Sequence, residues 1–472
     1  MNLKNFIDKI NNLEKSVDIS ILEVFNFNPW PVIRQNIYTR YDEQFLINPN
    51  QFIRINLLTK INSFYLSLIN YFKNPLKNEK VDILFLTRSS ESLDIIENKK
   101  FNRYSDSFIH FFNNKYKIKV IETLDSYIKT TNYYNSNTSN IFIKTLPLRI
   151  KSIIINKFKH IYNIKKINNK IELEFNIKVS INRELIYINE LRKFYEKILQ
   201  SYSPKIVMLA CYYRPDAMAM TLACKKHGIK VVEYQHGAQN NNHAMYSNWA
   251  NIPQNGYELL PDIFWTWGNV SEERIKKWAE NTNRHNAVIG GNLWLAYNKN
   301  QIINNNNVNI KFNKEKYNIL VSLQGDERFP DYLIEYIETL GEDYSWYFRN
   351  HPRIPVSEKL QNKLNSLSDI SVNEAMALDL YALLTNMDLH ITGYSTVAFE
   401  AQSFGVPTIF THINAKNGHQ DLIGKNGLYF ADSIEDFSNK VSFIQENKEE
   451  IKPDYIISDV TVAEKALEEL MD

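Results

Sequence analysis

His236 is the residue of this chain best suited to move a proton. It follows residues 230–235, which form the second strand of an expected strand–helix–strand unit, and it precedes Gly237. Histidine is the side chain whose ordinary pKa lies near neutrality, so a neutral His236 could accept a proton from a substrate hydroxyl. A histidine that only holds the backbone of a turn is the alternative. We interpret His236 as a candidate catalytic base.

Two charged residues follow the preceding apolar run, residues 206–211, in the same way. These are Arg214 and Asp216, which lie just before an expected helix. Asp216 could cap that helix. It could instead be a second catalytic carboxylate that orients His236 or stabilises developing positive charge.

Another pair of charged residues follows an earlier apolar run. Residues 81–86 predict a further buried strand, and Arg88 and Glu91 lie in the polar loop after it. This loop corresponds to the one that holds Arg214, since ligands of parallel sheets bind beyond the carboxyl ends of the strands. We therefore assign Arg88, Glu91 and Arg214 to the binding of a second substrate, the acceptor.

A strand-to-helix turn later in the chain has the composition of a phosphate site. Gly393 ends the apolar run 389–392, and Ser395 and Thr396 stand at the start of the following helix. The free N–H groups and the positive dipole end of a helix favour an anion there. Glu400, one turn further on, could accept hydrogen bonds from ribose hydroxyls. A plain N-cap with a surface glutamate is the alternative.

Two further strand ends complete a candidate nucleotide site. His351, Pro352 and Arg353 follow one apolar run, and the imidazole and guanidinium can both donate to phosphate oxygens. Gly325 ends another run and would let the backbone approach a ligand. We assign Gly325, His351 and Arg353 to the nucleotide, together with the turn at Ser395. The sequence has no P-loop, no dinucleotide-binding glycine pattern and no metal-ligand spacing, so we expect no metal.

Strands and helices alternate along most of the chain. After a helical N-terminal segment, short apolar runs ending in polar loops alternate with helical patterns, which is typical of parallel α/β sheets. A polar low-complexity stretch, 298–313, divides the pattern and is interpreted as a linker. We predict an α/β fold of two Rossmann-like doubly wound domains around a central cleft. Residues 1–297 would form the acceptor side and 314–472 the nucleotide side.

The composition is ordinary for a globular chain. Of 472 residues, 44% are hydrophobic and 23% charged, and the net charge of +2 gives no sign of a nucleic-acid partner. Two cysteines exclude a disulfide scaffold. We find no signal peptide and no apolar run long enough to span a membrane, so we expect a cytoplasmic protein. The Lys-rich segment 151–170 could contact the inner membrane peripherally, although we favour a solvated helix.

The motifs taken together resemble a known family. They are QHG at 235–237, QGD at 324–326, NHPR at 350–353 and GYSTVAFEAQSFGVPTIF at 393–410. They are similar to motifs of GT-B glycosyltransferases of bacterial capsule and lipopolysaccharide biosynthesis, above all those that use CMP-activated acidic sugars, the sialyl- and Kdo-transferases. The resemblance covers residues 205 to 435.

This resemblance implies a metal-independent glycosyltransferase. By its motifs, His351 with Pro352 and Ser395 with Thr396 would hold the CMP group of the donor. The partners implied are a nucleotide-sugar donor and a glycan or lipid-linked acceptor, without nucleic acid. No cofactor is implied, because the nucleotide-sugar is itself a substrate.

Two related families stay open as alternatives. Polyol-phosphate transferases of teichoic acid synthesis, which use CDP-glycerol, also carry a His-Gly in the first half and a His-Pro with a Ser-rich turn in the second. The non-hydrolysing UDP-GlcNAc 2-epimerases share the fold and a similar Ser-turn, helix and Glu element. Tyr394-Ser395-Thr396 stands here in place of the Ser-Ser pair common in those families, which leaves the donor undetermined.

Overall fold

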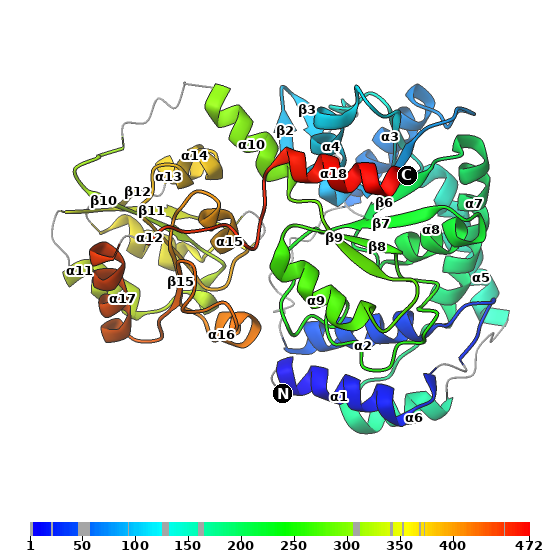
Figure 1. Ribbon diagram of the computed structural model, residues 1–472, viewed down its shortest axis with the longest axis horizontal. Coiled ribbons are helices and arrows are strands. Elements are labelled where there is room, and N and C mark those ends of the chain that lie inside the picture. Colours follow the sequence, from blue (N-terminus) through cyan, green and yellow to red (C-terminus); the bar gives the residue numbers. More distant parts are fainter. Residues whose placement is uncertain are drawn as a thin grey trace. The chain divides into compact units, whose positions relative to one another are not determined.

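In the computed structural model the chain forms two compact units (Figure 1). The first comprises the described residues of Met1–Asn50, Arg54–Trp294 and Asp459–Asp472, and the second those of Leu295–Ser458. The described residues are 3–19, 22–45, 57–92, 94–124, 132–158, 165–304, 312–339, 343–351, 354–367, 370–371, 373–447 and 449–472.

A seven-stranded parallel sheet forms the centre of the first unit. The strand order is β5 (Thr138–Asn140), β4 (Ile118–Thr123), β1 (Ile83–Arg88), β6 (Ile206–Ala210), β7 (Lys230–Tyr234), β8 (Ile263–Thr266) and β9 (Asn286–Ile289). Within β1, Leu84 and Leu86 enter one apolar core, and Ile83 and Phe85 enter another. Because successive side chains of a strand point to opposite faces, both faces of this sheet are covered.

Helices and a small hairpin surround this sheet. They are α1 (Leu3–Ser16), α2 (Trp30–Phe45), α3 (Leu57–Lys73), the 3-10 turn η3 (Ser89–Glu91), β2 (Asp94–Ile96), β3 (Lys99–Phe101), α4 (Ser105–Phe112), α5 (Phe142–Phe158), α6 (Lys165–Phe175), α7 (Asn182–Tyr202), α8 (Pro215–Lys226), α9 (Asn269–Ala279) and α18 (Val460–Met471). Gly228, with a φ of 68°, follows the end of α8 as its sequence predicts. No helix within the described ranges is both long and apolar enough to cross a membrane.

The last helix, α18, differs from the sequence prediction, which placed it with the second domain. Its Ala463, Leu467 and Leu470 are buried in the same apolar core as Ile83 of β1. Lys230 Nζ of β7 also donates to the carbonyl of Leu470 at 3.0 Å. The apolar stripe of α18 was readable from the sequence, but the sheet that it covers was not.

The second unit is also built on a parallel sheet, of six strands. Their order is β12 (Ile370–Ser371), β11 (Tyr344–Arg349), β10 (Tyr317–Ser322), β13 (Leu389–Thr392), β14 (Thr408–Phe410) and β15 (Leu428–Phe430). Helix α10 (Leu293–Asn304) begins in the first unit and continues into the second from Leu295. The remaining elements are the 3-10 turn η4 (Asp326–Arg328), α11 (Tyr332–Thr339), α12 (Glu358–Asn365), α13 (Asn373–Ala377), α14 (Leu380–Leu384), α15 (Val397–Gln402), α16 (Ile413–His419) and α17 (Ile434–Glu446).

The two parallel sheets confirm the predicted α/β fold class of two doubly wound domains. The predicted linker 298–313 is only partly irregular. Residues 298–304 belong to helix α10, and 305–311 lie outside the described residues. Its Asn-rich composition was therefore a poor guide, because a polar surface helix has the same composition as a polar connection.

Candidate functional site

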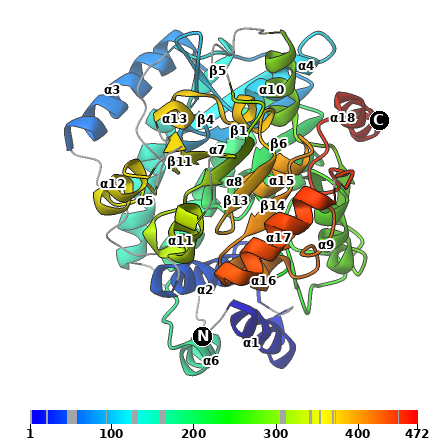
Figure 2. The same cartoon turned by 90° about the vertical axis from the view of Figure 1, so that its left-hand side faces the viewer.

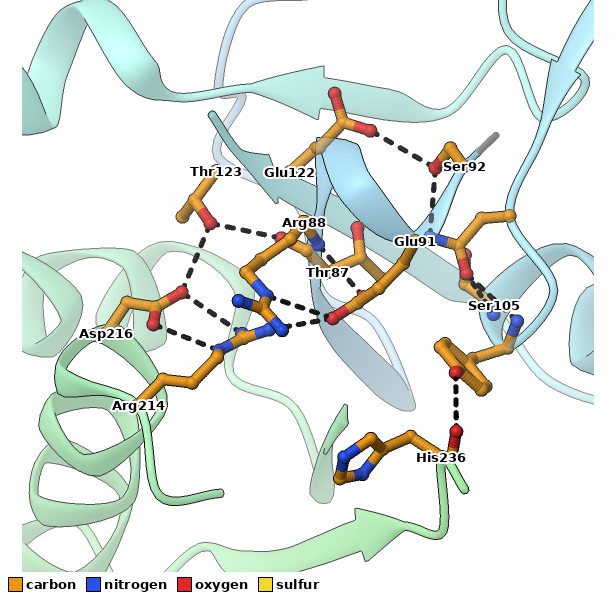
Figure 3. A network of polar contacts seen from close by, with 12 residues as sticks. Thr87, Arg88, Glu91, Ser92, Ser105, Glu122, Thr123, Arg214, Asp216 and His236 are labelled. Atoms are coloured by element: carbon orange, nitrogen blue, oxygen red, sulfur yellow. Dashed lines mark hydrogen bonds and ion pairs between the residues drawn. The ribbon is translucent and has the colours of Figure 1, made fainter. Parts of the chain in front are cut away.

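The predicted acceptor residues and Asp216 form one ion-pair network at the strand ends of the first unit (Figure 3). Arg214 donates to Glu91 Oε1 at 2.7 Å and to the two carboxylate oxygens of Asp216 at 3.2 and 3.1 Å. Arg88 Nε donates to the same glutamate oxygen at 3.3 Å. Thr123 Oγ1 donates to Asp216 Oδ2 at 3.1 Å. The sheet register pairs Arg88 with Thr123, which brings these loops together.

In the structure Asp216 binds arginine, and it neither caps α8 nor contacts His236. Arg214 is the N-cap residue of α8, without a side-chain cap, and Pro215 is the first helical residue. The hydrogen bonds of Asp216 to described residues go to Arg214 and Thr123, so Asp216 does not orient His236. Its carboxylate instead holds the guanidinium of Arg214, which is 7% exposed. Removing that guanidinium from water is costly, and the two carboxylates around it offset the cost.

A cavity of about 230 Å³ adjoins this network. Arg88, Arg214 and Asp216 line it from the strand ends, and further polar and aromatic groups line it from α5 and α7. Tyr195 of α7 belongs to this lining and is fully buried, yet its hydroxyl has no hydrogen-bond partner among the described residues. A buried hydroxyl without a partner is costly, and a ligand or water in the cavity would supply one.

Replacing Tyr195 with phenylalanine should leave the free energy of unfolding unchanged or raise it by about 1 kcal/mol, because no protein hydrogen bond is lost. The matched control is Tyr133→Phe. The Tyr133 hydroxyl donates to the buried carboxylate of Glu122 at 2.6 Å, so this variant should lose about 1–3 kcal/mol. Urea unfolding of both variants measures the difference. Equal losses would show that Tyr195 has a protein partner.

His236 lies where the sequence predicted, two residues after the end of β7, and it has a carboxylate partner that the sequence did not assign. Its Nδ1 lies 3.1 Å from the Tyr246 hydroxyl and 3.5 Å from Glu233 Oε1. Tyr246 also donates to Glu233, which is buried. The His236 carbonyl accepts from the Tyr104 hydroxyl at 3.0 Å. The ring and the backbone of His236 are thus both held.

The surroundings of His236 favour its protonated form. Burial alone would lower the pKa, because it removes water from the imidazolium, but contacts with Cys211 and Glu233 outweigh burial and raise the pKa of His236 to about 10. A histidine with this pKa carries its proton at neutral pH. In this state it can donate a proton or pair with an anion, whereas the predicted role of general base needs the neutral ring.

Arg34 fixes the loop that carries Tyr246. It is fully buried, pairs with Glu14, and donates to the carbonyls of Ala244 at 2.7 Å and Asn248 at 3.0 Å. Its guanidinium lies over the ring of Trp249, 4.3 Å from the centroid. The role of this arginine is therefore to hold the chain beside His236 from within the core.

In the second unit, the turn after β13 leaves little space for a side chain at Gly393. A Cβ on Gly393 would lie 3.1 Å from Gln324 Oε1 and 3.3 Å from Arg328. Gln324 Oε1 also accepts from the backbone N–H of Tyr394 at 2.8 Å. Ser395 Oγ accepts from the backbone N–H of Val397, the first residue of α15, at 3.3 Å. The helix that follows, α15, has only six residues, so its dipole is a weaker attraction for phosphate than the sequence suggested.

Gly325 and the residues next to it lie beside this turn. Gly325 has a φ of 86° and precedes η4, which permits the sharp bend after β10. Arg328 stacks over the ring of Tyr394, 4.8 Å from its centroid. Gln324, Arg328 and Gly393 line a cavity of about 10 Å³, which is room for roughly one water molecule and not for a nucleotide.

The structure gives fewer contacts for the other residues that were predicted to bind the nucleotide. His351 is half-buried at the end of β11, which is separated from β13 by β10. Arg353, like Pro352, lies outside the described residues. Thr396 caps α15 with its backbone alone, and one oxygen of Glu400 accepts from the Tyr381 hydroxyl at 3.1 Å.

Several contributors to these sites were not predicted. Glu233 could have been suspected, because a carboxylate inside a strand buried on both faces needs a partner. Arg328 lies two residues after the QGD motif at 324–326 and could have been suspected from that position. Tyr195 could not be recognised from the sequence as a site residue, because an aromatic residue at helical spacing ordinarily indicates core packing.

Comparison with known proteins identifies the fold. No protein-family model matches the sequence. No curated protein matches it either.

Solved structures match over most of the chain. A UDP-GlcNAc 2-epimerase from Methanocaldococcus jannaschii has 14% identity, covering 83% of this chain and 100% of that one, with a TM-score of 0.52. The enzyme of the same organism in complex with UDP-GlcNAc and UDP has 15% identity, 82% and 99% coverage, and a TM-score of 0.51. The enzyme from Neisseria meningitidis bound to UDP-GlcNAc has 14% identity, 83% and 99% coverage, and a TM-score of 0.50. At these identities the likeness shows the GT-B type of fold.

Proposed function

We propose that this chain is an enzyme that transfers a sugar from a nucleotide-activated donor, with a CMP-sugar favoured, to a surface-glycan or lipid-linked acceptor. The cavity of the first unit carries this proposal. A sugar combines hydroxyl groups with apolar C–H faces, so its site needs charged groups and rings together. Asp216, Arg88 and Tyr187 line the cavity and supply both. The proposal includes no cofactor, since the nucleotide-sugar is a substrate.

The proposed roles follow from the protonation and position of each group. Asp216 would accept the hydrogen bond of the acceptor hydroxyl that attacks the donor, with Arg88, Glu91 and Arg214 as its supports. His236, protonated at neutral pH, would stabilise negative charge or donate a proton rather than act as the base. The donor nucleotide would be held by the second unit.

The proposed donor residues of the second unit are Gly325, His351, Arg353, Ser395, Thr396 and Glu400. The motif resemblance of His351-Pro352 and of the Ser395 turn favours a CMP group among the nucleotides. Arg328 joins this set, because its guanidinium lies at the Gly393 turn.

A UDP-sugar 2-epimerase is the second candidate. It is favoured by the three solved structures named above, which are UDP-GlcNAc 2-epimerases. An epimerase acts on one nucleotide-sugar without an acceptor, so it would leave the cavity of the first unit unexplained.

Thermal unfolding with CMP, CDP, UDP and GDP tests the proposal. CMP at about 100 times its Kd should stabilise the chain by about 2.7 kcal/mol and raise Tm by roughly 5 °C, more than the other nucleotides do. His351→Ala should reduce the shift. The control is His227→Ala, at the exposed end of α8 in the first unit, which should leave the shift unchanged.

Other outcomes point elsewhere. A largest shift with UDP, together with release of an epimer when no acceptor is present, would replace the transferase by an epimerase. A largest shift with CDP and a phosphodiester product would indicate a polyol-phosphate transferase. No shift with any nucleotide would overturn the assignment to nucleotide-sugar chemistry.

A further inference from the structure

Helix α3 carries polar side chains on its inner face. Ser63, Ser67 and Asn70 are buried there. Asn70 Oδ1 accepts from the backbone N–H of Asn140 in β5 at 2.7 Å, and the Ser67 hydroxyl donates to the side chain of Asn140. A helix that docks on a protein core ordinarily turns its apolar face inward. Helix α3 is therefore rotated the opposite way about its axis, with a polar face towards the core.

The outer face of α3 is apolar. Leu58 is 76% exposed, Ile61 56%, Tyr65 59% and Phe72 73%. Their spacing of three, four and seven residues places them along one side of the helix. α3 lies at an edge of the first unit (Figure 2). Large apolar side chains gathered on an exposed helix face mark a contact with another apolar phase or partner.

Helix α5 extends this apolar area. The rings of Phe64 on α3 and Phe142 on α5 pack edge to face at 6.0 Å, so the two helices are neighbours. On α5, Ile150, Ile154 and Phe158 are exposed at four-residue spacing. We define the α3–α5 surface by seven side chains: Leu58, Ile61, Tyr65, Phe72, Ile150, Ile154 and Phe158.

The charges on these two helices have one sign. The sequences of α3 and α5 contain no Asp or Glu. Lys73, Lys144, Arg149 and Lys157 are exposed basic residues of the two helices. Lys151 pairs with Glu190 at 2.6 Å and is still 54% exposed. The whole chain is nearly balanced, with 55 basic and 53 acidic residues, so the excess of positive charge here is local.

We propose that the α3–α5 surface docks on an anionic lipid bilayer. The apolar side chains would enter the boundary between headgroups and acyl chains, and the basic side chains would pair with anionic headgroups. A second copy of the same surface fits less well, because it would bring like charges together. This inference rests on α3 and α5 alone and does not depend on the proposed transferase activity.

Docking of α5 on a bilayer would also determine where the cavity of the first unit lies. Phe142, Thr145 and Arg149 of α5 line that cavity. A bilayer-bound α5 would hold the cavity close to the membrane, where a lipid-linked substrate is confined.

Vesicle co-sedimentation of the full chain tests the proposal. The chain should bind vesicles of phosphatidylcholine with added phosphatidylglycerol, bind phosphatidylcholine alone weakly, and dissociate as salt is raised. The triple variant Leu58→Ser, Phe72→Ser, Phe158→Ser should lower binding at least about tenfold. Leu173→Ser is the matched control, because this leucine of α6 is 86% exposed outside the surface, and it should bind as the wild type does.

All substituted side chains are exposed, so unchanged Tm values would show that the variants fold. Absence of wild-type binding to anionic vesicles, or equal binding by the triple variant, would overturn the proposal. A concentration-dependent dimer in light scattering that only the triple variant abolishes, without vesicle binding, would assign the surface to a second copy of the chain and would overturn the bilayer. None of these readouts requires a nucleotide, so they are separate from the test of the transferase.

Discussion

Replacing Arg34 with methionine should lower the free energy of unfolding by about 3–5 kcal/mol. The guanidinium is fully buried and is the charge partner of Glu14, which is also buried. Methionine approximates the volume of the side chain, but it leaves an uncompensated carboxylate and unsatisfied carbonyls at Ala244 and Asn248. Urea unfolding measures the loss.

A double-mutant cycle separates the ion pair from the other contacts of Arg34. In a Glu14→Gln background, Arg34→Met should cost less than in the wild type, because the uncompensated charge is already gone. Arg40→Met, on the exposed side of the same helix, should stay within about 0.5 kcal/mol of the wild type. A loss below about 1 kcal/mol for Arg34→Met would mean that the buried pair is not formed in solution.

Replacing Gly290 with alanine should destabilise the protein by roughly 3 kcal/mol, at the upper end of the usual cost of overpacking. The added Cβ would overlap the indole ring of Trp265. That ring cannot easily move away, because it is fully buried, stacks on Tyr234 at 5.9 Å between centroids, and donates from Nε1 to the Gly291 carbonyl at 3.1 Å. Thermal unfolding should show the loss as a lower Tm.

Gly237→Ala is the matched control for the same chemical change. A Cβ on Gly237 would have no heavy atom within 4 Å of it, so stability should be unchanged or slightly raised. Since Gly237 follows His236, this control also shows whether the turn tolerates a side chain. Similar Tm values for the two variants would contradict the packing described around Trp265.

The architecture was largely readable from the sequence. The runs around β1, β6, β10 and β13 are short, mainly apolar and closed by polar loops, and parallel strands buried on both faces require this pattern. Short edge strands such as β5 and β12 carry no such run. Their pairing is decided by neighbours distant in sequence. The position of α18 escaped prediction for the same reason.

The sequence predicted at which strand ends the site residues lie, but it did not predict which residues pair with one another. The strand-end rule brought Arg88, Glu91, Arg214 and Asp216 together correctly. It could not tell that Asp216 would pair with arginine instead of serving His236, because a side chain's choice among nearby partners depends on distances of a few ångströms. The pKa of His236 depends in the same way on its contacts with Cys211 and with Glu233, which lies in the strand before it.

The return of α18 makes the first unit discontinuous along the chain, with the second unit inserted between its segments. A fragment ending at residue 294 would lack the apolar side chains of Ala463, Leu467 and Leu470 and would expose the layer beneath them. The N-terminal fold therefore cannot be completed until the C-terminal residues have been synthesised. Loss of residues 459–472 should therefore destabilise the first unit, although these residues follow the second unit in the sequence.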